Sequence, residues 1–144
     1  MKSKKLKTVA QLLIVCLIAF AACKKSEKVE TFEIKIDYIE ITFNGAVAHV
    51  DDSISIRLHG HIGPNQCYKL AYLPYFYLDP KAQDTNRHIF EVYGIYEENK
   101  NGNPCAPTES LLDHEIKVVF REPGIYTFYD INDPDTKLGE IDVK

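Results

Sequence analysis

Two histidines on one short stretch are the first residues of this sequence that could do chemistry. His59 and His61 lie in SISIRLHGHI, residues 53–62, where polar and apolar side chains alternate. Side chains two apart on a strand share one face and lie about 6 to 7 Å apart, so both imidazoles could bind one metal ion. A third ligand would come from His49, His88 or His114. The alternative is that both are polar side chains on the wet face of a strand.

Other groupings of reactive side chains fit no known catalytic pattern. The pairs Asp51-Asp52 and Glu97-Glu98 lack the spaced oxygens of a calcium loop and are explained by turns and solvated faces. The sequence has no serine nucleophile motif, no glycine-rich phosphate loop and no zinc-protease helix motif. We therefore expect a protein that is not an enzyme and has no cofactor. A small metal-binding protein or metal-dependent enzyme that uses His59 and His61 is the alternative.

A run rich in tyrosine is the strongest candidate for a binding surface. Five aromatic residues fall within ten positions: Tyr68, Tyr72, Tyr75, Phe76 and Tyr77. One buried strand cannot hide so many rings, so some of the tyrosines are expected at the surface. Exposed tyrosine is typical of contact with a protein or a carbohydrate, which makes an envelope protein or a glycan the expected partner. Packing in the core and along an edge strand is the alternative.

The amino terminus has the pattern of a secretory signal. KSKKLK, residues 2–7, is a basic segment, and an apolar stretch follows over residues 9–22, interrupted by Gln11. About 14 apolar residues are too few for a transmembrane helix, which needs about 20, but suit a signal peptide. We therefore expect export.

The end of this apolar stretch, Phe20-Ala21-Ala22-Cys23, resembles the lipobox of bacterial lipoprotein precursors, although Phe20 stands where an aliphatic residue is usual. The resemblance implies cleavage after Ala22 and acylation of Cys23. The alternative is ordinary signal-peptidase cleavage at a site such as Ala19-Phe20-Ala21, with Cys23 merely nearby. Two or three acyl chains anchor a protein stably in a bilayer. The expected organisation is a signal peptide over residues 1–22, a lipidated cysteine and flexible tether over 23–30, and one domain over 31–144. The tether carries no acidic run directly after Cys23, which favours an inner- or outer-membrane anchor that faces the periplasm.

Charge argues against nucleic acid as a partner. Loss of residues 1–22 removes four lysines, which leaves 13 basic against 21 acidic side chains and lowers the formal net charge from −4 to −8. An acidic surface repels phosphates, and no basic patch with interleaved aromatic residues is visible.

The four cysteines separate into three groups. Cys16 leaves with the signal peptide, Cys23 is the lipid acceptor, and Cys67 and Cys105 remain in the exported domain. A disulfide bond is the most economical use of two cysteines in an exported domain of this size. The alternative is a reactive thiol or a metal-binding pair, but the sequence has no C-x-x-C spacing.

Strand patterns dominate the rest of the chain. The apolar phase in residues 32–43 slips by one residue at Tyr38-Ile39, which predicts a β-bulge or a change of sheet. Ile54, Ile56, Leu58 and Ile62 are expected to face the core. Further strands are predicted over residues 67–73, 75–78, 88–96, 115–120, 125–129 and 138–143. About eight short strands with frequent turn signals predict an all-β sandwich.

Two resemblances bear on this sandwich. GHIGPNQCYKL at residues 60–70, the later Cys105 and EPGIYTFYD at 122–130 are similar to small bacterial lipoprotein domains of immunoglobulin-like fold. That similarity implies an immunoglobulin-like β-sandwich with a Cys67–Cys105 bridge and no defined activity. The chain end also looks like the last strands of a cupredoxin, but Asp130 stands where copper would need a cysteine, so we expect no blue-copper site.

Overall fold

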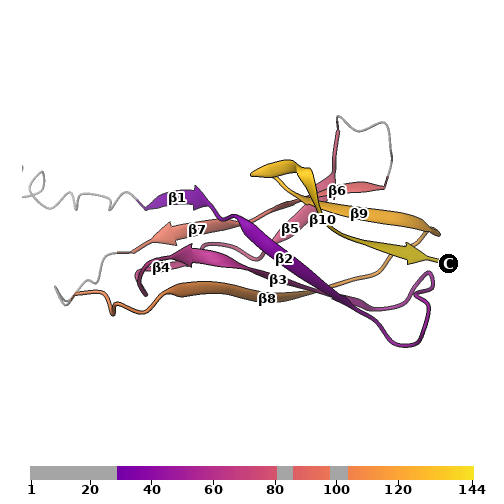
Figure 1. Ribbon diagram of the computed structural model, residues 1–144, viewed down its shortest axis with the longest axis horizontal. Helices are drawn as coiled ribbons and strands as arrows, with labels where there is room; N and C mark the ends of the chain where they lie inside the picture. Colours follow the sequence, from indigo (N-terminus) through magenta and orange to yellow (C-terminus); the bar gives the residue numbers. More distant parts are fainter. Residues whose placement is uncertain (1–28, 81–85, 98–103) are drawn as a thin grey trace, which may run out of the picture.

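Strands make up all of the regular structure in the computed structural model, which describes residues 29–80, 86–97 and 104–144 (Figure 1). The prediction of an all-β chain is therefore confirmed for these residues. The strands are β1 (Glu30–Glu33), β2 (Ile36–Thr42), β3 (Ile54–Gly63), β4 (Tyr68–Leu70), β5 (Tyr75–Leu78), β6 (Arg87–Glu91), β7 (Tyr93–Tyr96), β8 (Ser110–Val118), β9 (Gly124–Asp130) and β10 (Asp133–Val143).

These strands form three sheets. Sheet A has the order β1-β7-β4, sheet B the order β2-β3-β8, and sheet C the order β10-β9-β6-β5. All pairs within the sheets are antiparallel except β6 with β9, which is parallel. Sheet A lies toward one end of the long axis and the C-terminus lies at the other (Figure 1).

The core forms where alternating apolar side chains of the sheets meet. On β3, Ile54, Ile56, Leu58 and Ile62 are buried, as their alternation predicts. They belong to one cluster that also contains buried side chains of sheet C, including Phe90 and Phe128. Side chains of sheet A are partly buried against the same cluster. The described strands thus share one hydrophobic core.

The slip in the apolar phase near Tyr38 marks both a bulge and a change of sheet. The chain leaves sheet A after Glu33 and enters sheet B at Ile36, and the pairing of β2 with β3 shifts between Ile36 and Tyr38. Gly60 lies beneath this crossover. A Cβ atom at Gly60 would lie 2.5 Å from the carbonyl oxygen of Lys35, so only glycine lets β3 approach so closely.

A second crossover divides a segment that the sequence predicts as one strand. Residues 88–96 were expected to be continuous, but the chain passes from sheet C to sheet A at the buried Val92, between β6 and β7. The two crossovers together account for ten strands instead of the predicted eight. The apolar pattern alone does not reveal this break, because a buried valine at position 92 is also what one continuous strand would have there.

A buried carboxylate joins the two crossovers. Asp130, at the end of β9, is only 1% exposed. Its Oδ2 accepts a hydrogen bond from the Ile36 amide at 2.9 Å, and its Oδ1 accepts from the Asn132 backbone amide at 3.2 Å. The Asn132 side-chain amide also donates to Asp130 and to the Ile34 carbonyl, and the Ile34 amide donates to the Val92 carbonyl at 2.8 Å. We call this set of contacts the crossover junction.

No helix among the described residues is long and apolar enough to cross a membrane.

His88 is a titratable group within the aromatic part of the core. It is 8% exposed, and its ring lies 5.2 Å from Phe76, 5.7 Å from Tyr126 and 5.9 Å from Phe128, measured between ring centroids. Its Nδ1 lies 3.0 Å from the carbonyl oxygen of Asn86, an arrangement in which Nδ1–H donates. Burial disfavours the charged imidazolium and lowers the pKa of His88 below its ordinary value.

The stability of the fold should therefore depend on pH through His88. In the unfolded chain this histidine takes up a proton near pH 6.5, whereas in the folded chain it does so only at lower pH. The unfolded state then binds more protons, so the free energy of unfolding is highest above about pH 6.5 and falls as the pH is lowered. Urea denaturation at pH 7.5 and 5.5 should show a smaller difference for His88→Phe than for the wild type. Equal differences in both proteins would contradict this role.

Candidate binding surface

A glutamate on the outer face of sheet C, away from the core, lies between two tyrosines, one in sheet C and one in sheet A. Tyr75 on β5 pairs in register with Glu91 on β6, and Tyr93 follows two positions later on β7. The hydroxyl groups of Tyr75 and Tyr93 each donate a hydrogen bond to a different oxygen of the Glu91 carboxylate. Pairing across β5 and β6 and the crossover at Val92 bring these three side chains together.

The hydrogen bonds fix the protonation of this group. The Tyr75 and Tyr93 hydroxyls stabilise the carboxylate and lower the pKa of Glu91, so Glu91 is charged at neutral pH. The same bond to Glu91 raises the pKa of Tyr93 to about 12 and also raises the pKa of Tyr75. At neutral pH the two tyrosines therefore keep their protons and Glu91 stays charged, so their arrangement suits binding better than proton transfer.

Two further tyrosines extend the group. The Tyr72 ring lies 6.3 Å from that of Tyr93 in an edge-to-face contact, and the Tyr77 ring lies 6.5 Å from that of Tyr75. Tyr72 is 61% exposed and Tyr75 is 47% exposed. We call Tyr72, Tyr75, Tyr77, Tyr93 and Glu91 the tyrosine cluster. The sequence singled out Tyr72, Tyr75 and Tyr77 but missed Tyr93 and Glu91.

Tyr68, the fourth tyrosine predicted for a binding surface, does not join the cluster. It lies on β4 and packs over Gly63, with its ring 5.7 Å from Phe32 and 5.1 Å from Tyr96. Tyr68 is partly buried against the core. Its place fits the alternative interpretation, in which a tyrosine of this run packs inward.

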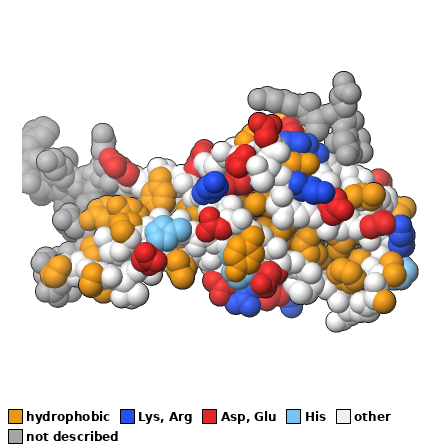
Figure 2. Space-filling view, viewed as in Figure 1, with side chains coloured by type: hydrophobic (Ala, Val, Ile, Leu, Met, Phe, Trp, Pro, Cys, Tyr) orange, Lys and Arg blue, Asp and Glu red, His pale blue; other side chains and the backbone are white. Residues whose placement is uncertain are grey.

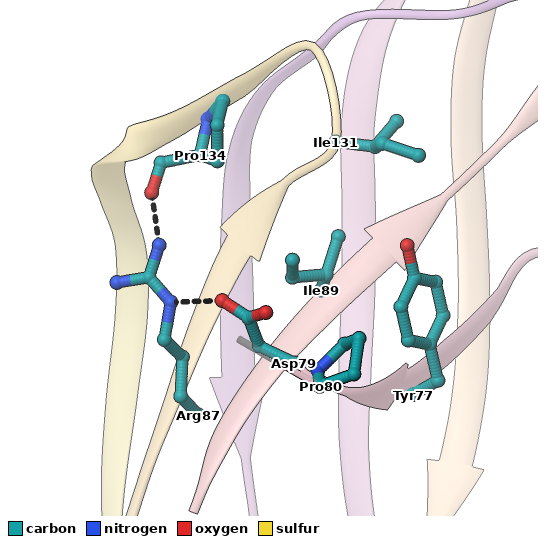
Figure 3. Close-up of a pocket in the computed structure, with 7 residues that line it drawn as sticks. All are labelled: Tyr77, Asp79, Pro80, Arg87, Ile89, Ile131 and Pro134. Carbon is teal, nitrogen blue, oxygen red and sulfur yellow. Dashed lines mark hydrogen bonds and ion pairs between the residues drawn. The ribbon is translucent and has the colours of Figure 1, made fainter. Parts of the chain in front are cut away.

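A pocket adjoins the tyrosine cluster at Tyr77 (Figure 3). It has a volume of about 400 Å³ and is lined by Tyr77, Asp79, Pro80, Arg87, Ile89, Ile131 and Pro134. The Arg87 Nε donates to Asp79 at 2.8 Å, and Nη2 donates to the Pro134 carbonyl. The guanidinium carbon also lies 3.7 Å from the centroid of the Tyr129 ring. Arg87 is thus held by contacts within the protein. No pattern in the sequence predicted this pocket.

The surface of the molecule carries both signs of charge. Figure 2 shows hydrophobic side chains in several separate patches on the face drawn there, with acidic and basic side chains between them. The large hydrophobic side chains that are exposed include Leu73, Leu111 and Ile125.

The two histidines predicted as metal ligands, His59 and His61, lie in different surroundings. His59 stacks on Tyr38 with ring centroids 4.4 Å apart, and its ring nitrogens lie 3.6 Å from a Glu40 oxygen and 3.9 Å from an Asp113 oxygen. His61 is exposed on the same strand. Asp113 is engaged by Arg57. Within the residues that the structure describes, no group of three His, Cys, Asp or Glu side chains is placed to hold a metal ion.

The acidic pairs occupy turns and surface positions where the structure describes them. Asp52 accepts a hydrogen bond from the His49 amide, and Asp51 forms an ion pair with Arg121. Glu97 forms an ion pair with Lys69 at 2.9 Å, whereas Glu98 lies outside the described residues.

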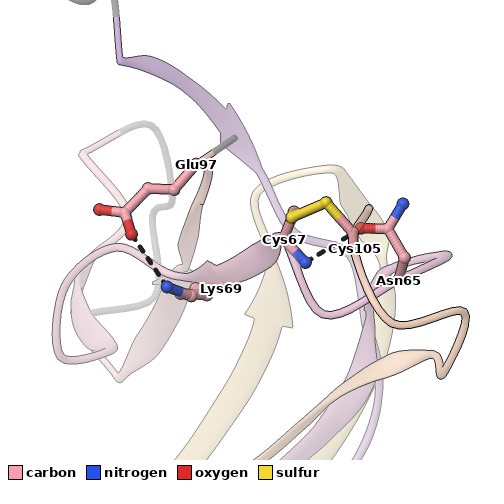
Figure 4. The surroundings of a disulfide bond; sticks show 5 residues. All are labelled: Asn65, Cys67, Lys69, Glu97 and Cys105. Carbon is pink, nitrogen blue, oxygen red and sulfur yellow. Dashed lines mark hydrogen bonds and ion pairs between the residues drawn. A yellow bond between two sulfur atoms is a disulfide. The ribbon is translucent and has the colours of Figure 1, made fainter. Parts of the chain in front are cut away.

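The predicted disulfide bond is confirmed. Cys67 and Cys105 are bonded, with their Cα atoms 5.6 Å apart (Figure 4). The Asn65 side chain accepts a hydrogen bond from the Cys67 amide at 3.0 Å, and the Gln66 amide donates to the Ala106 carbonyl. The bond therefore ties the turn between β3 and β4 to the segment that leads into β8. The predicted lipid acceptor, Cys23, lies outside the described residues.

No protein-family model matches this chain, and neither a curated protein nor a solved structure is significantly similar to it.

Loss of the disulfide should destabilise the domain. The bond spans a separation of 38 residues, and closure of such a loop contributes about 3 to 4 kcal/mol on the chain-entropy model. Denaturant unfolding of the Cys67→Ser, Cys105→Ser double variant should give a correspondingly lower free energy of unfolding than that of the wild type. Unchanged stability would show that the bond constrains little in the unfolded chain.

Proposed function

We propose that this protein is a lipid-anchored, non-enzymatic binding module of the bacterial cell envelope, with an immunoglobulin-like β-sandwich held on the membrane by Cys23. The amino-terminal pattern supports the anchor, since the apolar run that ends in Ala-Ala-Cys resembles the lipobox of lipoprotein precursors. The all-β fold with one shared core and the Cys67–Cys105 bond supports a small exported domain.

The observation that carries the binding role is the tyrosine cluster. Tyrosine supplies a large, rigid contact area and is enriched among the residues that contribute most to binding energy at interfaces. Here two tyrosines donate hydrogen bonds to one charged glutamate and two further tyrosines contact their rings, with Tyr72 and Tyr75 well exposed. A fold that needed these rings only for its core would bury them.

The anchor is tested by metabolic labelling with an alkyne analogue of palmitate in cells that produce the full-length chain. The wild type should become labelled and sediment with membranes. Cys23→Ser should lose both properties, because the acceptor thiol is gone. Label that persists in Cys23→Ser would refute the anchor.

The binding surface is tested by a photoreactive amino acid placed in turn at Tyr72, Tyr75 and Leu111 in the native bacterium. Leu111 on β8 is the matched control, because its exposed fraction, 62%, equals that of Tyr72 within one percent. Irradiation should yield a discrete adduct at positions 72 and 75 but not at 111. The same adducts at all three positions, or none at any, would count against a binding role for this face.

A further inference from the structure

The hydrogen bonds of the tyrosine cluster decide which kind of ligand it suits. A tyrosine hydroxyl has one proton to donate and two lone pairs to accept with. Tyr75 and Tyr93 both spend that proton on Glu91. The remaining capacity of the two hydroxyls and of the carboxylate is to accept hydrogen bonds. A ligand rich in donors therefore fits better than a sugar, whose hydroxyl groups need donors as well as acceptors.

The charge of the cluster points in the same direction. No described lysine or arginine forms an ion pair with Glu91. Arg87 lies four residues along the same strand, about 13 Å away in an extended chain, and is held by Asp79 and Pro134. The faces of aromatic rings carry partial negative charge and attract cations. A carboxylate bonded by two tyrosine hydroxyls, with two further rings beside those tyrosines, is thus complementary to an ammonium or guanidinium group.

The open form of the cluster favours a polypeptide over a free small cation. Tyr72 and Tyr75 are too exposed to enclose and dehydrate a small ammonium compound. However, β5 is the outermost strand of sheet C, and no described strand pairs with its outer edge. Such an edge can accept an extended peptide as an additional strand. Leu78, the last residue of β5, and Leu73, two residues before the strand begins, are largely exposed and offer apolar contacts to this peptide.

We propose that the edge of β5 and the tyrosine cluster bind an extended basic segment of a partner protein, with lysine or arginine at alternate positions. Because side chains alternate along a strand, the basic residues would lie beside Tyr75 and Tyr77 and approach Glu91. The intervening residues would point to the other face of sheet C, toward Leu78. This inference rests on the proposed binding function and names the chemistry of its partner.

The test uses the full-length protein in nanodiscs of uncharged phospholipid, with empty nanodiscs as the blank. Binding of three fluorescent octapeptides is compared by fluorescence anisotropy. In each peptide valine alternates with one other residue, which is lysine, glutamate or serine. Only the Lys-Val peptide should bind, and added salt should weaken it because the attraction is between charges. Preferential binding of the Ser-Val peptide, equal binding of the Glu-Val peptide, or no binding of the Lys-Val peptide would overturn the inference.

Variants locate the site. Glu91→Gln keeps the shape of the side chain and removes its charge, and Tyr75→Ala removes a ring. Each should weaken binding of the Lys-Val peptide by about tenfold. Glu109→Gln and Tyr38→Ala make the same changes at exposed positions of the described surface outside the cluster, and both should bind like the wild type. Equal effects of cluster and control variants would overturn the inference, provided that circular dichroism shows all four to be folded.

The outcome separates this inference from the function on which it rests. Adducts at positions 72 and 75 in cells, together with no binding of the Lys-Val peptide, would leave the binding function standing and refute a basic partner. A third outcome is that the wild type binds a soluble fragment of cell-wall glycan, that Tyr75→Ala abolishes this binding, and that the Lys-Val peptide does not bind. This outcome would refute the basic partner in favour of a carbohydrate.

Discussion

One buried carboxylate determines how the three sheets of this domain are joined. Asp130 stands at the end of a strand of sheet C and binds the backbone at the point where the chain enters sheet B. A carboxyl group can remain buried in such a place only when hydrogen bonds replace its hydration, and here three N–H groups of Ile36 and Asn132 do so. No described lysine or arginine is paired with Asp130, so the backbone amide of Ile36 is an essential part of its environment.

The crossover junction also places the candidate binding surface. Glu91 ends β6 in sheet C, and Tyr93 begins β7 in sheet A, with only Val92 between them. The Val92 carbonyl accepts from Ile34, and the Phe90 carbonyl accepts from Ile131, which follows Asp130. The strands on either side of the break are therefore fixed relative to each other. The residues of the tyrosine cluster come from sheets A and C, and the hydrogen bonds to Glu91 form only when the two sheets keep these relative positions.

Much of the fold was predictable from the sequence, because apolar alternation reports burial directly. The pattern of Ile54, Ile56, Leu58 and Ile62 predicted a core strand, and the one-residue slip near Tyr38 predicted a bulge or a change of sheet. The cysteine count predicted the disulfide. The break at Val92 has no signal in the sequence, because a buried valine fits a continuous strand equally well. Without that break and the register of β5 with β6, neither Glu91 nor Tyr93 could be assigned to the tyrosines.

Amide hydrogen exchange at Ile36 tests most directly whether Asp130 holds the junction. In Asp130→Ala the Ile36 amide loses its acceptor, so its protection should fall by about tenfold or more relative to the wild type. Protection at Leu58, in the middle of sheet B, should change less. Asp142→Ala on the neighbouring strand β10 is the control and should leave both amides as they are. Wild-type protection of Ile36 in Asp130→Ala would contradict the account, because the junction would then stand without its carboxylate.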